Sequence, residues 1–549
     1  MFSSLIRPSA ATFGYLSASI ILLLVVWYAT VQVQRSLRIR RLGGGRALNV
    51  APNFVSVWRM FSELGQAYEE NRMLDFYTRL YGNQNVVEFE VPPSNRILAT
   101  RDPDHIKTIL TTKFAEFGKG PGFHEQWKAF LGDSIFTTDG NLWHGSRSLI
   151  RPMFLKDRVS DLAKIERGVQ AFMAQLPSSG QTVQLMGLLY RATLDITTEF
   201  LLGRSAGSLE NPKVAFLQAF DKVQSVQMRI AIMSRLTDFA SPFDIFVGRK
   251  EYNCGIKTLE SFIMPFVEKT LSLSVEELEE ISKSDRDFTF LHGLASFTRD
   301  PKVIRDQIMA VLLAGRDTTA GTLSWAFCAS PPSMFQSPCD APYGLQSPQK
   351  LTVGAFHELA AYPDKWARLR EEVLSTVGPH KAPTYDDLKN LRYMRYTLQE
   401  TLRLYPAVPY NQRSALQDTT LPGGPGRPDI VVLKGDVVGY SPYVMQRRRD
   451  LYPPVTAEFA DPLIFNPERW YNWQPKSWEF LPFNGGPRIC VGQNFAMTEM
   501  AYFLVRILQR YERLEYRGDW EAQLHQADIV GRPSLGVPVA LFEAGEGHA

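Results

Sequence analysis

Apolar residues recur at helical spacing along most of the chain, and short strand-like segments interrupt this pattern. The clearest helical segments are residues 64–81, 212–233, 261–273 and 303–327. Alternating or β-branched runs, which are typical of strands, occur at residues 85–91, 96–100 and 430–433. No internal repeat or change of composition marks a second domain. The pattern predicts one large domain, mainly α with small β-sheets.

The longest uncharged segment lies near the N-terminus. Residues 11–33 carry no charged side chain, and as a helix they would extend over roughly 35 Å, which is enough to cross a bilayer core. One arginine precedes this segment and five follow it closely: Arg7, then Arg35, Arg38, Arg40, Arg41 and Arg46. The positive-inside rule therefore predicts luminal residues 1–10, a transmembrane anchor at 11–33, a basic and Gly-rich linker at 34–52, and a cytosolic body at 53–549. A buried core helix is the alternative.

Composition narrows the class of protein. Hydrophobic residues make up 45% and aromatic residues 12% of the chain, which supports a sizeable core and excludes general disorder. The net charge is +3, and no basic stripe with interleaved aromatic residues indicates nucleic-acid binding. The cysteines are too few and too irregularly spaced for a disulfide framework or a zinc site, and they indicate a reducing compartment. They are Cys254, Cys328, Cys339 and Cys490.

Cys490 lies in an unusual glycine-rich turn, within the segment FLPFNGGPRICVGQNFA at residues 480–496. The glycines allow the backbone to fold closely around the sulfur, and the helix expected to start near Cys490 directs its positive end toward it. Phe483 is placed to shield the sulfur, and Arg488 to pair with an anionic group. A thiolate in such a turn suits haem iron as an axial ligand. For an isolated cysteine, a buried structural role is the alternative.

The whole segment resembles the haem-binding sequence of the cytochrome P450 superfamily, Phe-x-x-Gly-x-Arg-x-Cys-x-Gly. The matching positions are Phe483, Gly486, Arg488, Cys490 and Gly492. The resemblance implies a haem-thiolate monooxygenase of the cytochrome P450 fold, with haem between a long central helix and the loop of the Cys490 ligand. It covers roughly residues 75–539.

Further segments resemble the family in the same order along the chain. Residues 314–319, AGRDTT, resemble its oxygen-activating segment, in which Gly315 leaves room for dioxygen, Thr318 supplies a hydrogen bond and Asp317 helps to relay protons. A polar patch without function is the alternative, although burial makes such a patch costly. The expected structural ion-pair network consists of Glu400, Arg403 and Arg469. The residues expected near the haem propionates are Trp143, Arg147 and Arg413.

The resemblance is strongest to fungal alkane and fatty-acid hydroxylases. It implies a lipophilic substrate, dioxygen, and NADPH electrons delivered through flavins of a cytochrome P450 reductase at the endoplasmic reticulum membrane; a product of secondary metabolism is the other substrate class. The pocket residues that the resemblance implies are Phe123, Leu312, Leu313, Val408 and Pro409; for each of them a place in the core is the alternative. A basic face for the reductase is expected from Arg147, Arg151, Lys156 and Arg447–Arg449. An ordinary solvated surface is the alternative.

Residues 328–356 depart from the family pattern. This segment contains Pro331 and Pro332, which no helix would cross, and its excision joins residue 327 to residue 357 in a continuous amphipathic pattern. We interpret it as translated intron sequence, with a long surface loop as the alternative. Two other functions remain open: a haem-binding protein that the insertion prevents from turning over, and a haem-thiolate isomerase or dehydratase. Asp317 and Thr318 argue against the isomerase or dehydratase.

Overall fold

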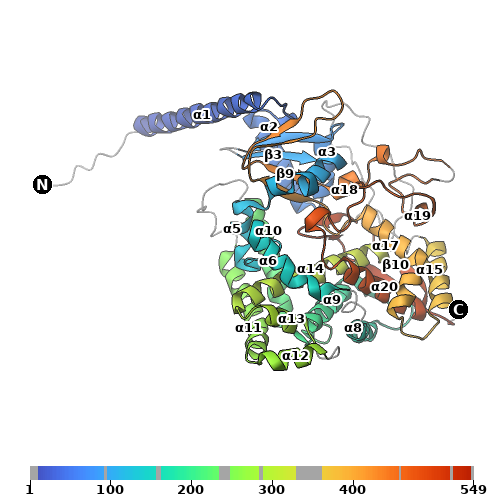
Figure 1. Ribbon diagram of the computed structural model, residues 1–549. Coiled ribbons are helices and arrows are strands. Elements are labelled where there is room, and N and C mark those ends of the chain that lie inside the picture. Colours follow the sequence, from blue (N-terminus) through green and yellow to red (C-terminus); the bar gives the residue numbers. More distant parts are fainter. Residues whose placement is uncertain are drawn as a thin grey trace.

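The computed structural model describes residues 10–91, 95–155, 162–233, 248–283, 288–328, 362–456, 459–519 and 523–545. The fold is mainly helical with small sheets, as predicted (Figure 1). Its helices are α1 (Ala10–Arg41), α2 (Phe54–Glu69), α3 (Met73–Tyr81), α4 (Pro103–Lys107), α5 (Gly120–Leu131), α6 (Gly140–Ile150), α8 (Ala163–Met173), α9 (Leu185–Leu202), α10 (Ala215–Met233), α11 (Arg249–Leu271), α12 (Val275–Lys283), α13 (Phe290–Phe297), α14 (Pro301–Phe327), α15 (Pro363–Thr376), α16 (Tyr385–Asn390), α17 (Arg392–Leu404), α18 (Pro442–Met445), α19 (Arg469–Asn472) and α20 (Gln493–Arg510).

The strands form one larger sheet and three small ones. They are β1 (Leu48–Ala51), β2 (Val86–Val91), β3 (Asn95–Thr100), β4 (Phe117–Gly118), β5 (Thr182–Gln184), β6 (Asn411–Ala415), β7 (Thr419–Leu421), β8 (Ile430–Val432), β9 (Val437–Tyr440), β10 (Tyr511–Tyr516), β11 (His525–Ala527), β12 (Gly531–Pro533) and β13 (Pro538–Glu543). The six-stranded sheet has the order β1-β2-β3-β9-β6-β4. It lies with α2 and α3 at one end of the molecule, and helices make up most of the rest (Figure 1).

Most predicted elements are present, with one division. The segment 64–81 forms the end of α2 and all of α3 rather than one helix. Asn71, between them, has a φ of 58°, and this left-handed backbone ends a right-handed helix. Within the residues that the structure describes, no helix combines the length and the apolar character that a membrane crossing needs. The transmembrane helix predicted at residues 11–33 is therefore not supported there.

The central helix α14 packs against α9 along much of its length. Its N-cap residue Asp300 accepts hydrogen bonds from the backbone N–H groups of Lys302 and Val303, which defines the start of the helix. Inside the helix pair, the Thr193 hydroxyl donates a hydrogen bond to the carbonyl oxygen of Arg316 at 3.0 Å. This contact fixes the register of the two helices just beside the AGRDTT segment.

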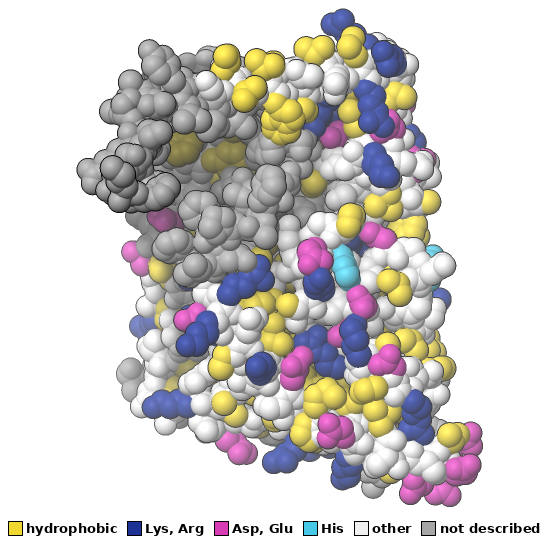
Figure 2. Space-filling view, turned by 90° about the vertical axis from the view of Figure 1, so that its left-hand side faces the viewer, with side chains coloured by type: hydrophobic (Ala, Val, Ile, Leu, Met, Phe, Trp, Pro, Cys, Tyr) yellow, Lys and Arg dark blue, Asp and Glu magenta, His cyan; other side chains and the backbone are white. Residues whose placement is uncertain are grey.

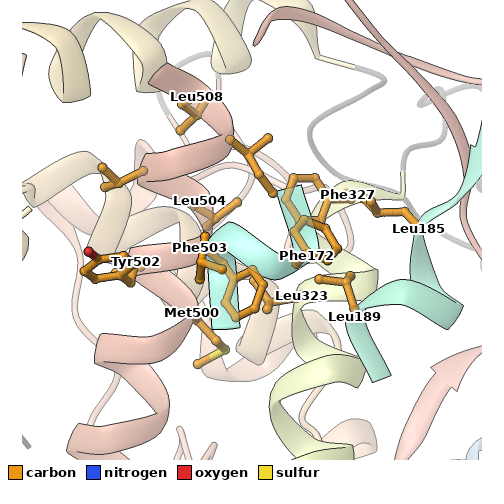
Figure 3. Packing of buried hydrophobic residues seen from close by; sticks show 14 of the residues in the cluster. Phe172, Leu185, Leu189, Leu323, Phe327, Met500, Tyr502, Phe503, Leu504 and Leu508 are labelled. Carbon is orange, nitrogen blue, oxygen red and sulfur yellow. The ribbon is translucent and has the colours of Figure 1, made fainter. Parts of the chain in front are cut away.

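One apolar core holds the C-terminal half of α14 and the helix that follows the Cys490 turn. Leu323 and Phe327 of α14 lie close to Phe503 of α20 and Phe172 of α8 (Figure 3). The rings of Phe172 and Phe503 meet edge to face, with centroids 5.4 Å apart. The same packed interior therefore positions both the segment around Thr318 and the turn around Cys490.

Candidate functional site

The Cys490 turn folds back on itself immediately before α20. The backbone N–H of Cys490 donates to the carbonyl oxygen of Phe483 at 2.9 Å, and α20 begins after its N-cap residue Gly492. Gly486 has a φ of +64°, and a Cβ there would lie 2.0 Å from the carbonyl oxygen of Leu110. Only glycine fits this backbone. This explains why the haem-binding sequence that the segment resembles has a glycine at position 486.

The Cys490 side chain is both exposed and poorly solvated. It has a large free surface, yet burial raises its thiol pKa, while the Gly492 N–H group and the charge of Arg147 act in the opposite direction. Free surface and desolvation occur together when a side chain faces a hollow inside the protein. The N–H group and Arg147 favour the thiolate form, which is the form that binds iron. Cys490 therefore has the surroundings that an axial haem ligand needs.

Beyond its first turn, the central helix has free surface at one small patch only. From Ile304 to Cys328 every residue is buried except Ala314, Gly315 and Thr318, and Ala314 and Thr318 are one turn apart. The Thr318 hydroxyl donates to the carbonyl oxygen of Ala314 at 2.7 Å. A helix that is packed on all sides beyond its first turn thus leaves the predicted oxygen-activating segment partly uncovered, as a bound planar cofactor requires.

Gly315 has a different surrounding from the one we expected. A Cβ at Gly315 would lie 2.9 Å from Oγ1 and 3.0 Å from Cγ2 of Thr197 in α9. The missing side chain therefore allows α9 and α14 to approach each other closely, and the space it leaves is not reserved for dioxygen.

Four cations gather around the turn. Burial and the positive charges of Arg413 and Arg488 lower the pKa of Lys119 well below its ordinary value, and burial and Arg413 lower the pKa of Arg488 to about 10. Arg147 completes the group by donating to the carbonyl oxygen of Ile489 at 3.0 Å. Asp139 pairs with Arg488 at 2.6 Å, but one carboxylate does not balance the three guanidinium groups. The surplus positive charge fits the propionates of haem.

Two side chains of this cationic cluster, Arg147 and Arg488, lie over the ring of Trp143. The Arg488 guanidinium lies over the indole at 4.7 Å from its centroid, while its Nε has no hydrogen-bond partner among the described residues. Trp143 is 2% exposed, and Arg413 is held by the side chain of Asn411 at 3.0 Å. The structure thus brings Trp143, Arg147, Arg413 and Arg488 to one region. Lys119 was not predicted, since a single lysine in a glycine-rich loop gives no distinctive signal.

The predicted ion-pair network is present and complete. The Glu400 carboxylate accepts from Arg403 Nε and Arg469 Nε, each at 2.8 Å, and also from the indole N–H of Trp470 at 2.9 Å and the backbone N–H of Asn466 at 2.9 Å. Burial opposes ionisation, but the two guanidinium groups outweigh it and lower the Glu400 pKa to about 2. Trp470 and Asn466 were not predicted as members of the network.

Three of the five expected pocket residues share one apolar cluster. Leu312 and Leu313 are buried in it, and Phe123 packs against it. Val408 and Pro409 do not belong to this cluster. Val408 is 38% exposed, and the carbonyl oxygen of Pro409 accepts a hydrogen bond from the Ser441 hydroxyl. Ile529 and Val491 also pack against it and were not predicted.

The expected basic face does not form one positive surface. Arg448 pairs with Asp450 at 2.5 Å, and Arg449 pairs with Asp461 at 2.8 Å. Arg447 lies over the ring of Tyr443 at 3.7 Å, and Arg147 belongs to the cationic cluster described above. Arg151 is exposed, while residue 156 lies outside the described residues. On the face drawn in Figure 2, basic and acidic side chains are likewise intermixed.

Glu499 of α20 is an unexpected acidic residue in the interior. It is fully buried, and burial raises its pKa to about 8, while the nearby Thr319 side chain favours the anion without a well-directed hydrogen bond. The folded protein therefore binds a proton between about pH 4.5 and about pH 8 that the unfolded chain has released. Stability from this group is complete below the unfolded pKa and is lost as the pH rises through the folded pKa.

We expect Glu499→Gln to remove this pH dependence. Between pH 5 and pH 8, the free energy of unfolding of the unsubstituted protein should fall by up to about 1.4 kcal/mol per pH unit more than that of the variant. Denaturant unfolding at several pH values measures both slopes. Equal slopes would show that Glu499 is not protonated in the folded protein.

Comparison with known proteins agrees with this site. The cytochrome P450 family model matches residues 52–330 and 353–536. The chain is 40% identical over 551 residues to cytochrome P450 monooxygenase pvhE of Talaromyces variabilis, covering 96% of this chain and 95% of that protein. It is 32% identical to cytochrome P450 52A13 of Debaryomyces hansenii, covering 90% and 93% of the two chains.

The fold agrees with a solved structure as well. The crystal structure of the cytochrome P450DA haem domain superposes with a TM-score of 0.70 at 18% identity, covering 91% of this chain and 98% of that chain. The thiol of Cys490, the cationic cluster and the open patch on α14 fit the haem that this family binds through a thiolate. The chain belongs to the cytochrome P450 family and is a haem-thiolate monooxygenase.

Proposed function

We propose that the protein hydroxylates a lipophilic small molecule, either an alkyl-chain or fatty-acid-like compound or a fungal secondary metabolite. Dioxygen is the oxidant, and NADPH supplies electrons through a flavoprotein reductase. The observation that carries this proposal is the Cys490 thiol, which is desolvated and yet has free surface. The apolar cluster containing Leu312 and Leu313 supports a lipophilic substrate.

Each group of residues has one task in this proposal. Cys490 holds the haem, which supplies dioxygen activation, and Arg147, Arg413, Arg488 and Lys119 hold its propionates. Phe123 faces the apolar substrate, and the cluster that contains Leu312 and Leu313 backs this wall and excludes water. Thr318 places its hydroxyl at the open patch of α14, and Asp317, buried behind it, exchanges the proton. Glu400, Arg403 and Arg469 keep the fold around the site rigid.

The insertion does not favour a protein without turnover. Helix α14 continues to Phe327, so Asp317 and Thr318 lie about two and a half turns before its end. The family model leaves residues 331–352 unmatched, which supports our interpretation of residues 328–356 as additional to the catalytic body. Transcript sequencing tests the intron origin, and a message that retains this segment would contradict it. We expect higher haem incorporation when the segment is deleted.

Membrane attachment is part of the proposal. We propose that residues 11–33 anchor the protein in the endoplasmic reticulum membrane, with the catalytic body in the cytosol. The uncharged sequence and the arginines that follow it support this arrangement. Carbonate extraction of microsomes tests it, because an integral protein stays in the membrane pellet. Release into the supernatant would contradict the anchor.

Spectroscopy and turnover together test the main proposal. The purified protein should give the red-shifted Soret band of a thiolate-ligated ferrous haem with carbon monoxide. Addition of fatty acids, alkanes or polyketide-like compounds should then shift the spin state of the iron for the class that binds. Product formation should require NADPH and reductase. A carbon monoxide band without reductase-dependent product from any class would favour a haem-binding protein without turnover.

We expect Thr318→Ala to separate electron consumption from product formation. Its carbon monoxide spectrum should be unchanged, because Thr318 does not hold the haem. Product formed per NADPH should fall by up to about 100-fold, and peroxide should rise in proportion, since the hydroxyl that directs proton transfer is lost. Peroxide and product assays measure the partition. An unchanged ratio of product to NADPH would contradict the role of Thr318.

A further inference from the structure

Helix α10 directly contacts the buried acid of the central helix. Nε2 of Gln224 in α10 donates a hydrogen bond to Oδ2 of Asp317 at 2.6 Å. Asp317 is 3% exposed, and its other oxygen, Oδ1, accepts no hydrogen bond among the described residues. A neutral amide is therefore the only hydrogen-bonding group that the described part of the chain provides for this carboxyl group.

A cation competes with the amide for the same carboxyl group. Nη1 of Arg316 lies 3.4 Å from Oδ1 of Asp317, while its Nη2 pairs with Asp221 of α10 at 2.7 Å. The Arg316 guanidinium also lies between the rings of Tyr190 and Phe220, at 5.3 Å and 5.0 Å from their centroids. Arg316 is thus held mainly by α9 and α10, and its contact with Asp317 is ionic but is not a hydrogen bond.

The Asp317 carboxyl group has two bonding partners within reach: the Gln224 amide, which it contacts now, and the Arg316 guanidinium. With the Gln224 hydrogen bond in place, Oδ2 is directed at the amide, and Oδ1 lies 3.4 Å from Arg316 without a hydrogen bond. Burial raises the Asp317 pKa, and the charge of Arg316 and the Gln224 N–H act in the opposite direction. Without that bond, rotation toward Arg316 would replace a neutral donor by a charged one, which favours the anion more strongly and turns the carboxyl group away from its present orientation.

We propose that Gln224 is a positioning residue that holds the Asp317 carboxyl group in the orientation needed for proton transfer beside Thr318. This inference rests on the proposed role of Asp317 in dioxygen activation. It makes the rate of proton transfer depend on the position of α10, because Gln224 and Asp221 both belong to that helix and both act on the pair Arg316–Asp317.

The test compares two glutamines of the same helix. Gln224→Met removes the hydrogen bond to Asp317 with little change of volume. Gln227→Met is the matched control, because Gln227 is fully buried in α10, donates to the Gln126 carbonyl oxygen at 3.1 Å and accepts from the Tyr252 hydroxyl, but has no hydrogen bond to Asp317. Both variants should lose some thermal stability.

The two variants should differ in turnover. We expect kcat to fall about 10-fold in Gln224→Met, while KM and the carbon monoxide band stay unchanged. A 1 Å misplacement of a catalytic group can cost about 10²-fold, so this loss is reasonable for a displaced Asp317 carboxyl group. The solvent deuterium isotope effect on kcat should increase, since proton transfer becomes slower. In Gln227→Met the isotope effect should equal that of the unsubstituted protein. If Gln224→Met fails to incorporate haem, Gln224→Asn, whose amide is one methylene shorter, is measured with the same expectation.

A double variant decides between positioning and general destabilisation. In the Asp317→Asn background, Gln224→Met should produce no further loss of kcat, because its target is already absent. An equal loss in both backgrounds, or an isotope effect that changes equally in Gln227→Met, would overturn the proposal. Failure of the proposed function is distinct from this, since it would be seen as absent reductase-dependent product in the unsubstituted protein.

Discussion

Cys490→Ala should abolish both the thiolate Soret band and product formation, while most of the fold is retained. The thiol is the group that the turn presents to the interior, and the Gly492 N–H and Arg147 are placed to favour its anion. The methyl side chain of alanine has no lone pair and therefore cannot bind the iron. Carbon monoxide difference spectra and turnover with reductase measure the loss, and circular dichroism checks the helices.

The matched control is the cysteine of α11. Cys254 is exposed and free, and Cys254→Ala should leave the spectrum, the haem content and the turnover unchanged. A Cys490→Ala protein with an unaltered carbon monoxide band would show that another residue binds the iron. The assignment of the cationic cluster to the propionates would then fail as well, because that cluster surrounds the same turn.

The features predicted correctly from sequence are those fixed by spacing within one element. Glu400 and Arg403 are three residues apart in a helix and therefore lie on one face, and they form the expected ion pair. The helix over residues 303–327 was predicted because its apolar residues continue across the polar segment at Asp317. The turn at Cys490 was predicted because several glycines surround one cysteine. Such glycines allow the backbone to fold tightly around the sulfur.

The features that sequence did not predict depend on contacts between distant elements. Lys119 joins the cationic cluster only because β4 pairs with β6, which brings the Arg413 strand beside it. The contact between Gln224 and Asp317 exists because α10 crosses α14 at one particular turn. Glu499 occupies an ordinary helical position, and only the packing of α20 against its neighbouring helices excludes water from it. Arg449 pairs with Asp461, which is 12 residues away and gives no local signal. The pair of Arg448 with Asp450 is different, because Asp450 directly follows the three arginines in the sequence, and this pairing was missed.

Glu400→Gln should cause the largest loss of stability of any single substitution considered for this chain. The carboxylate is fully buried and balances two buried guanidinium groups. Removal of one partner from such a buried network costs about 3–5 kcal/mol, which is a large part of the roughly 5–15 kcal/mol that separates folded from unfolded domains. We expect little soluble haem protein at 37 °C, measured as the yield of the carbon monoxide band per unit of polypeptide.

The acid side of the stability curve provides an independent test of the same group. The pKa of Glu400 falls from its ordinary value of 4.5 to about 2 in the folded protein, so the stabilisation is present above pH 4.5 and is lost as the pH falls toward 2. Glu468→Gln is the control, because Glu468 pairs with Lys365 and Arg368 but is 32% exposed, and exposed pairs contribute about 0–1 kcal/mol. If both variants lost equal stability at pH 7, the network around Glu400 would contribute no more than a surface ion pair, and the rigidity of the site would have to come from the apolar core shared by α14 and α20.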